Sequence, residues 1–344
     1  MKYTTLGRTG LKTAVISFGG IPIQRSDTAN TMAVVDRLEK HGINYIDTAR
    51  GYTVSEEYLG RALKGRRDKF ILATKSMARD YEGMKKDIEI SLSNLQTDYI
   101  DVYQLHNIKV GDFDTVFGEN GAFKALIEAK KEGKIGFIGA TAHGTDSLEK
   151  LVDEHRNNID TLMFPYNIVE TQGHRILQKA KEKGIGTIAM KPLAGGNLDN
   201  WQLALRFIAA SGVCDISIPG MGDVAEVDKN AAVRENLSPL TEAELEEAEK
   251  VKKELGSRFC RRCGYCAPCT VGIDIPSNFL FVNYLRKYGL ADWAAERYRT
   301  LKVNASDCIQ CGACEERCPY NLPIREMLKG VVRDFDQYNK NKNR

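Results

Sequence analysis

The sequence alternates eight times between a short apolar run and a helical segment, and this alternation limits the fold more than any other feature. The runs that read as strands are Val15–Phe18, Asn44–Asp47, Phe70–Lys75, Tyr99–His106, Ile135–Thr141, Thr161–Phe164, Ile185–Met190 and Asp215–Pro219. The intervening stretches carry apolar residues at helical spacing, as in Tyr81–Gln96. Parallel strands joined by helical crossovers form either a doubly wound sheet or a closed (β/α)8 barrel.

Three features favour the barrel over the doubly wound sheet. The number of strands is eight, and no Gly-x-Gly-x-x-Gly follows the first of them. Polar residues also end several strands, namely Asp47, Lys75, His106 and Thr141. Before the first strand, Tyr3–Leu6 and Lys12–Ser17 read as a β-hairpin. The sequence therefore predicts an α/β fold, a (β/α)8 TIM barrel.

A second, smaller domain is expected after the barrel. The 344-residue chain exceeds one barrel of roughly 250 residues, and a charge-paired helix over Thr241–Leu255 stops at Gly256. We expect the barrel over residues 1–255, a second domain over 256–335 and a polar tail over 336–344. Within the second domain, Pro276–Tyr288 and Asp292–Leu301 read as helices.

Charge and hydropathy limit the kinds of partner that can be expected. The formal net charge of +3 gives no reason to expect nucleic acid or an anionic membrane. The N-terminal residues contain no apolar signal region, and no apolar run approaches the ~18 residues of a membrane helix. We expect a cytoplasmic protein with no nucleic-acid or membrane partner.

Cysteines crowd into the second domain. Eight of the nine lie between Cys260 and Cys318, and only Cys214, expected as a small core residue, lies outside. Such crowding favours metal ligation over disulfides. The two arrays consist of Cys260, Cys263, Cys266 and Cys269, and of Cys308, Cys311, Cys314 and Cys318.

The second array, followed by Pro319, has the spacing of bacterial ferredoxins, which sends the fourth cysteine to the other cluster. We therefore expect two [4Fe–4S] clusters, one held by Cys260, Cys263, Cys266 and Cys318 and the other by Cys308, Cys311, Cys314 and Cys269. The first array has two residues rather than three before its last cysteine, so a protein with one cluster stays open. Structural zinc is the alternative, but zinc sites usually pair two Cys-x2-Cys knuckles.

The strand ends carry a set of residues suited to proton transfer. Asp47, Lys75 and His106 end consecutive strands, and Tyr52 lies in the loop after Asp47. A tyrosine with a pKa near ~10 is a weak acid at neutral pH unless a cation lowers that value. Lys75 can supply this cation, Asp47 can hold it charged, and His106 can orient a substrate oxygen.

These residues make the first 240 positions or so resemble the aldo-keto reductases. The matching motifs are Asp47-x4-Tyr52, Lys75 closing Phe-Ile-Leu-Ala-Thr-Lys, and His106 closing Tyr-Ile-Asp-Val-Tyr-Gln-Leu-His. The resemblance implies a (β/α)8 barrel and NAD(P)H, with Tyr52 as general acid in the reduction of a small-molecule carbonyl substrate. The cysteine module resembles an α-helical ferredoxin domain, as certain members of the family carry at the C-terminus.

The resemblance also implies where the cofactor binds. The family's nicotinamide positions fall on Thr141 and Met190, and its pyrophosphate loop falls on residues 191–196, which include Lys191 and Leu193. Its adenosine positions fall on Gly220, Met221 and Asn230. Ala142 and Met163 replace the Asn and Gln that often bind the carboxamide, and Asn167 or His143 could compensate. Glu226 falls where an arginine often binds the 2′-phosphate. Because a carboxylate repels phosphate and accepts hydrogen bonds from a free ribose, we expect NADH to be used at least as well as NADPH.

Two functions follow from the sequence. The first is an NAD(P)H-dependent carbonyl reductase or alcohol dehydrogenase that carries iron–sulfur clusters. The second is an electron-transfer or redox-sensing protein whose barrel binds nicotinamide with little turnover and whose partner is an electron-transfer protein. The roles of the clusters (structural, sensing or electron-transferring) stay open at this stage.

Overall fold

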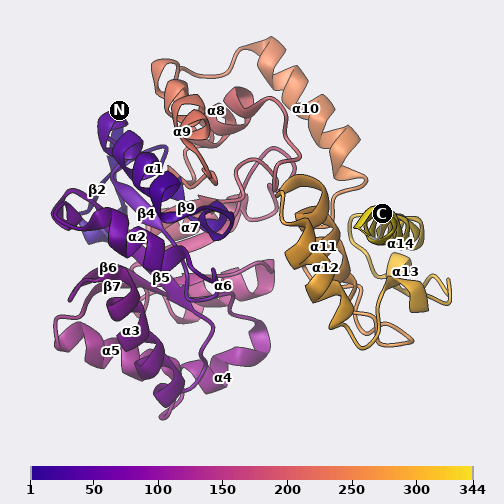
Figure 1. The fold of residues 1–344 in the computed structure, drawn as a ribbon, viewed down its shortest axis with the longest axis horizontal. Helices are drawn as coiled ribbons and strands as arrows, with labels where there is room; N and C mark the ends of the chain where they lie inside the picture. Colours follow the sequence, from indigo (N-terminus) through magenta and orange to yellow (C-terminus); the bar gives the residue numbers. More distant parts are fainter. Residues whose placement is uncertain (1, 343–344) are drawn as a thin grey trace. The chain divides into compact units, whose positions relative to one another are not determined.

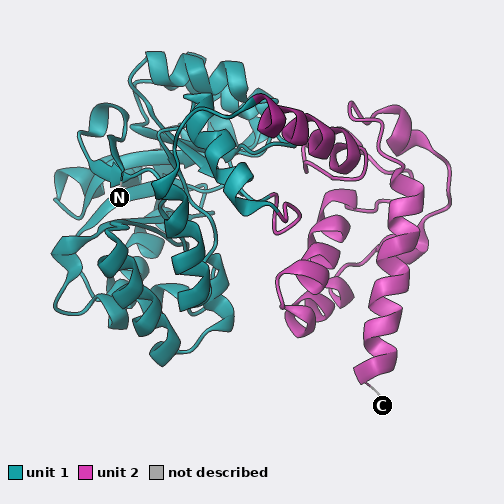
Figure 2. Ribbon diagram, turned by 90° about the horizontal axis from the view of Figure 1, so that it is seen from above, with its two compact units in different colours: residues 1–193, 200–241 teal, residues 194–199, 242–344 magenta. Residues whose placement is uncertain are grey.

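A computed structural model describes residues 2–342, which form two compact units. The first unit comprises residues 1–193 and 200–241, and the second comprises residues 194–199 and 242–344 (Figure 2). The two units therefore meet between Thr241 and Glu242. The sequence predicts the boundary after residue 255. Gly256 ends a helix, but the packing of that helix places it with the second unit.

The first unit is the expected (β/α)8 barrel. Its eight strands form one parallel sheet in chain order (Figure 1). They are β3 (Phe18–Gly19), β4 (Tyr45–Asp47), β5 (Ile71–Ser76), β6 (Ile100–Leu105), β7 (Ile135–Thr141), β8 (Thr161–Pro165), β9 (Gly186–Met190) and β10 (Ile216–Ser217). Parallel bridges from Ile16 to Ser217 and from Gly19 to Gly220 close the sheet on itself.

Helices follow the strands and cover the outside of the barrel. They are α1 (Thr28–His41), α2 (Ser55–Leu63), α3 (Tyr81–Leu95), α4 (Phe113–Val116), α5 (Ala122–Lys131), α6 (Thr145–Glu154), α7 (His174–Glu182), α8 (Trp201–Ser211) and α9 (Val224–Ala231). Local signals set their ends: the Asp80 side chain caps α3 by accepting from the Gly83 N–H at 2.8 Å, and Gln96 ends it in the left-handed conformation. The strands read as apolar runs because both of their faces are buried.

A β-hairpin closes the amino-terminal end of the barrel. Its strands are β1 (Tyr3–Thr5) and β2 (Lys12–Ala14). Leu6, which is fully buried, joins the interior cluster formed by residues of the barrel strands such as Ile188. The turn fits tightly: a Cβ on Gly7 would lie 2.2 Å from the Gly186 nitrogen, and the Arg8 N–H donates to the Gly184 carbonyl at 2.6 Å.

The second unit is helical. Its helices are α10 (Glu242–Gly256), α11 (Ile275–Lys287), α12 (Ala291–Arg299), α13 (Ala313–Glu316) and α14 (Ile324–Lys342). They enclose a core of their own, to which Cys266, Cys314 and Cys318 contribute together with side chains of α11 and α14. No helix within residues 2–342 is long and apolar enough to cross a membrane.

The last helix, α14, is longer than the sequence predicts. Residues 336–344 were expected as a polar tail, yet α14 continues to Lys342, and residues 343–344 lie outside the described part of the chain. Leu328, Val331 and Phe335 are buried on one face of this helix. Their spacing is helical, so the signal for α14 was present in the sequence.

Candidate functional site

The four side chains predicted at the strand ends lie together at the carboxyl-terminal end of the barrel. Asp47 ends β4, Lys75 lies in β5, His106 follows β6, and Tyr52 lies in the turn between β4 and α2. The Lys75 Nζ is 5.0 Å from the centre of the Tyr52 ring. The Tyr52 and His106 rings meet edge to face, with centroids 6.3 Å apart.

A buried ion pair forms the base of this group. The Lys75 Nζ donates to Asp47 Oδ2 and to the Thr48 carbonyl, the latter at 2.8 Å. Gln104 Nε2 donates to the other oxygen of Asp47 at 3.0 Å. Burial raises the pKa of Asp47 and lowers that of Lys75, and the opposite charge of each partner offsets part of this effect. The lysine side chain is thereby fixed below the Tyr52 ring.

His106 is a neutral group in this site. Burial lowers its pKa to about 3, with further contributions from the Lys75 and Arg79 cations. Its Nδ1 is buried and has no hydrogen-bond partner among the described residues. A neutral imidazole can donate a hydrogen bond to a substrate oxygen without supplying the proton for the reaction.

The structure adds two residues that the sequence analysis did not single out. Gln104 holds Asp47 and lies two positions before His106, so its polarity within an apolar run was a signal. Glu56, in the first turn of α2, is only 1% exposed. Its spacing to Leu59 and Leu63 places it on the apolar face of α2, unlike Glu57, whose side chain is 48% exposed.

The predicted nicotinamide positions lie at the ends of β7 and β9. Thr141 ends β7, and its Oγ1 accepts from the Asn107 N–H at 2.7 Å. Met190 ends β9 and is half-buried, and the backbone of Lys191 is left-handed with φ 53°. The Lys191 Nζ is buried without a hydrogen-bond partner in residues 2–342. Leu193 packs against the core around the barrel.

The predicted pyrophosphate loop continues past Leu193 into the second unit. There Ala194, Gly195 and Gly196 all have positive φ, between 47° and 78°. Within that unit the Gly195 carbonyl accepts from Asn283 Nδ2 at 3.4 Å, and the Ala194 carbonyl accepts from Asn197 Nδ2 at 2.7 Å. The loop is therefore held by side-chain amides of its own unit.

The predicted adenosine positions follow β10. Gly220 packs against Pro22 so closely that a Cβ would lie 2.9 Å from its Cγ, and Met221 is fully buried. Asn230 of α9 is 3% exposed, and its Oδ1 has no hydrogen-bond partner within the described chain. The Glu226 carboxylate accepts the Gly222 N–H, which fixes it beside the loop that begins α9.

The two residues considered as substitutes for the missing carboxamide ligands differ in their surroundings. Asn167 is fully buried, and its side chain bonds to Glu170, to the Val169 N–H and to the Lys191 carbonyl. Its amide is thus occupied in holding the turn after β8. The His143 Nδ1 pairs with Asn107 Oδ1 at 2.8 Å, so this ring nitrogen is occupied as well.

The cysteines of the first predicted group are electrostatic neighbours. Burial, together with nearby Cys266, Cys263 and Cys318, raises the pKa of the Cys260 thiol to about 12. Cys318, from the second array, thus lies with three cysteines of the first. The ferredoxin spacing predicts these four cysteines as the ligands of one cluster.

The second predicted group lines one pocket. The cysteines of this pocket are Cys269, Cys308, Cys311 and Cys314. Gln310 Nε2 donates to the Cys308 sulfur at 3.3 Å, and Arg317 and Arg325 also line the pocket. Thiolate sulfurs, nearby donors and cations suit an anionic iron–sulfur cluster. Over the described chain, no three or more His, Cys, Asp or Glu side chains are grouped to hold a single metal ion.

Comparison with known families gives a match for each unit. Residues 15–203 match the model of the aldo/keto reductase family, and residues 259–323 match a 4Fe-4S dicluster domain. The first match covers more than half of the chain. The protein belongs to the aldo/keto reductase family and carries a C-terminal ferredoxin-type 4Fe-4S domain.

Individual relatives agree with this assignment. L-galactose dehydrogenase from Arabidopsis thaliana is 30% identical over 288 residues, which cover 68% of this chain and 88% of the relative. The NADH-specific methylglyoxal reductase of Escherichia coli is 31% identical over 220 residues, covering 56% and 66%. Among solved structures, the holo form of aldo-keto reductase AKR11C1 from Bacillus halodurans superposes with a TM-score of 0.65 at 27% identity, covering 73% and 96%.

The family assignment makes the protein an oxidoreductase, and the family acts on small-molecule carbonyl substrates. The family uses NAD(P)H, and two orphaned polar atoms fit such a group. The Lys191 Nζ can donate to a phosphate, and the Asn230 Oδ1 can accept from the exocyclic amine of adenine. The donor set of sulfurs in the second unit fits iron–sulfur clusters in the same way.

Proposed function

We propose that the protein is an NAD(P)H-dependent oxidoreductase that reduces an aldehyde or ketone to an alcohol, or catalyses the reverse, with Tyr52 as general acid. The observation that carries this proposal is the buried Lys75, fixed between Asp47 and the Tyr52 ring. A cation next to a phenol favours the phenolate that remains after proton donation. A bound reduced nicotinamide supplies the hydride in this reaction.

The chain's own residues then have separate tasks. Tyr52 gives its hydroxyl proton to the carbonyl oxygen, and Lys75 stabilises the charge left on the phenol. Asp47, held by Gln104, keeps the lysine oriented. His106, which is neutral, donates a hydrogen bond that orients the carbonyl oxygen.

The experiment that tests this function compares Tyr52→Phe with Tyr58→Phe, which changes a partly buried tyrosine of α2 outside the site. Anaerobically purified protein is assayed with NADH and NADPH on a carbonyl panel that includes methylglyoxal, and with NAD+ on L-galactose, as the names of the relatives suggest. Tyr52→Phe should lower kcat by about 10²- to 10⁴-fold. Equal activity of the two variants would contradict the assignment.

We propose that the protein binds NADH more tightly than NADPH, or binds the two nucleotides equally well. The support is the Glu226 carboxylate, fixed beside the loop that begins α9 where a 2′-phosphate would meet its charge. The NADH-specific relative from Escherichia coli is in line with this preference. Dissociation constants for both nucleotides test it, and a clear preference for NADPH would be against it.

In the second unit we propose two [4Fe–4S] clusters. Cys260, Cys263, Cys266 and Cys318 hold one of them, and Cys269, Cys308, Cys311 and Cys314 hold the other. Cys311 is exposed and neighbouring Ile309 is 60% exposed, so an electron-transfer protein can approach the second cluster. Iron and sulfide assays with the visible spectrum test the proposal; a colourless protein that contains zinc would refute it.

A second candidate function is electron transfer or redox sensing with little turnover at the barrel. It is favoured by Met163 at the usual glutamine position and by the occupied amide of Asn167. In that case Tyr52→Phe leaves both the cluster spectra and the slow nicotinamide chemistry unchanged. In the enzyme, the same substitution abolishes carbonyl reduction and leaves the cluster spectra alone.

A further inference from the structure

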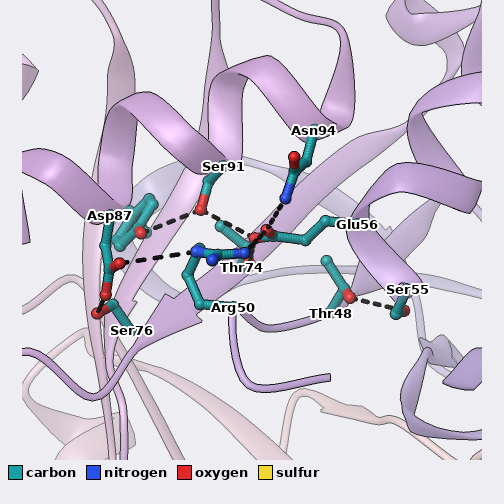
Figure 3. Close-up of polar contacts among 10 residues, drawn as sticks. Thr48, Arg50, Ser55, Glu56, Thr74, Ser76, Asp87, Ser91 and Asn94 are labelled. Atoms are coloured by element: carbon teal, nitrogen blue, oxygen red, sulfur yellow. Dashed lines mark hydrogen bonds and ion pairs between the residues drawn. The ribbon is translucent and has the colours of Figure 1, made fainter. Parts of the chain in front are cut away.

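Glu56 is a buried carboxylate that the proton-transfer scheme does not use. It lies in the first turn of α2, and only 1% of its surface is exposed. Four side chains donate to its two oxygens (Figure 3). They are Thr74 at 2.8 Å and Ser91 at 2.9 Å on Oε1, and Arg50 at 2.8 Å and Asn94 at 3.3 Å on Oε2. The carboxylate thus ties α2 to β5 and α3.

Arg50 extends these contacts around the catalytic lysine. Its backbone N–H donates to the Lys75 carbonyl at 3.0 Å, and its Nε lies 3.7 Å from Asp87 of α3. Asp87 in turn accepts from the Ser76 hydroxyl. The residues on either side of Lys75 are therefore bonded to Glu56 and to Asp87, and Arg50 contacts both carboxylates (Figure 3).

The same pair straddles the turn that carries Tyr52. The Arg50–Glu56 bond joins the two sides of this turn. A second bond, between the Thr48 and Ser55 hydroxyls at 2.8 Å, also joins the two sides (Figure 3). Inside the turn, the Ser55 N–H donates to the Tyr52 carbonyl at 2.8 Å. The place of the tyrosine is thus fixed from both ends of its turn.

The pair also acts on the charge of Lys75. Burial lowers the pKa of Lys75, Asp47 raises it most, and Glu56 is a second carboxylate that raises it. Arg50 is the cation that balances Glu56. Several neighbouring elements supply the titratable or charged groups around Lys75 and this pair. These groups are Asp47, Arg50, Tyr52, Glu56, Arg79, Asp87, Tyr103 and His106.

We propose that Glu56 and Arg50 are positioning residues of the active site, which hold the Tyr52 turn against β5 and balance the charge around Lys75. The proposal rests on the proposed role of Tyr52 as general acid. A contribution to stability is a poor explanation of the pair, because the cost of desolvating the buried Glu56 carboxylate and the partly buried Arg50 often cancels their attraction. A carboxylate with donors on both oxygens does, however, have only one orientation.

The test uses Glu56→Gln and Arg50→Gln, which change charge with little change in size. Glu56→Gln removes a negative charge near Lys75, so the lysine loses its proton more easily and the alkaline limb of kcat/KM for carbonyl reduction moves to lower pH. Arg50→Gln removes a positive charge and moves that limb to higher pH. We expect shifts of about half a pH unit or more. Plateau kcat should fall about tenfold in both variants as Tyr52 is displaced.

Hydrogen exchange of residues 48–56 gives a readout that needs no turnover. In both variants, exchange in this segment should accelerate about fivefold or more, while exchange in the remaining barrel stays unchanged. Matched controls are Glu57→Gln and Arg61→Gln, an exposed pair on the same helix whose charges are 3.9 Å apart. Neither control should move the pH limb or the exchange rate.

Each outcome decides the proposal. Opposite shifts of the limb with faster local exchange support it; shifts in the same direction, or none, overturn it. If the wild-type protein reduces no carbonyl, the proposed function fails while the exchange data still decide whether the pair holds the turn. If Glu56→Gln does not fold, Ser91→Ala removes one donor from Glu56, and unchanged exchange in that variant overturns the proposal.

Discussion

Replacing Asp47 by Asn tests the buried pair most directly. The Asp47 and Lys75 side chains are each 3% exposed, so the substitution leaves a buried cation without its counter-charge. Removing one partner of such a pair costs about 3 to 5 kcal/mol, because the remaining charge is uncompensated. We expect the free energy of unfolding of Asp47→Asn to fall by this amount at pH 6.

The direction in which the free energy of unfolding changes with pH shows which buried charge has lost its partner. Without Asp47, burial holds the folded-state pKa of Lys75 below its unfolded value of about 10.4. Between the folded-state and unfolded-state pKa values of Lys75, the unfolded chain binds one more proton than the folded chain. The free energy of unfolding therefore rises with pH by up to about 1.4 kcal/mol per unit. Lys75→Met leaves a buried carboxylate, for which burial holds the folded-state pKa of Asp47 above its unfolded value. The stability of that variant therefore recovers as the pH falls.

Urea unfolding between pH 5 and 9.5, followed by tryptophan fluorescence, measures both trends. The chain has two tryptophans, Trp201 in α8 and Trp293 in α12, so a Trp293→Phe background makes the signal report the barrel. The double variant Asp47→Leu with Lys75→Met should be about as stable as the parent and inactive. Parallel pH trends for the two single variants, or a double variant that loses the sum of both, would refute the reasoning.

Three further predictions concern the other parts of the site. Burial lowers the pKa of His106 to about 3, so its imidazole should stay neutral between pH 5 and 9; nitrogen NMR of labelled histidine checks this, and a titration near 6.5 would contradict it. Glu226→Gln should bring the affinity for NADPH about tenfold closer to that for NADH, because a repulsive charge is removed; calorimetric titration measures the ratio. Cys318→Ser should reduce the iron content from about eight to about four per chain and spare the cluster of Cys308, Cys311 and Cys314, whereas loss of both clusters would contradict the assigned ligands.

The barrel, and the positions of the polar residues at its strand ends, could be predicted because local patterns encode them. Each parallel strand is buried on both faces and appears as an apolar run, and Asp47, Lys75 and His106 stand where such runs end. The structure places all eight strands within a few residues of the expected positions. Helical periodicity also predicts α14, whose narrow apolar face lies among many polar residues.

The remainder of the site depends on tertiary packing, which local patterns do not carry. Helical spacing places Glu56 on the apolar face of α2, but its partners Thr74 and Ser91 come from β5 and α3, and only the packing of these elements brings them together. Asn167 had seemed free to bind a carboxamide, but its amide is used by the turn after β8. The division at Thr241 likewise follows contacts of α10 that the helix stop at Gly256 does not reveal.

The hairpin that closes the amino-terminal end of the barrel links the beginning of the chain to a much later part. Leu6 and Arg8 precede every strand of the barrel, yet Arg8 bonds to Gly184 and to Ile159, and Leu6 packs on Gly186. During synthesis Arg8 is made 151 positions before Ile159, and Gly184 and Gly186 are made later still. Completion of the barrel is therefore a late event in folding, with a large loop-closure cost. A nascent chain that stops before β9 leaves Leu6 without its packing partner and exposes the interior of the barrel.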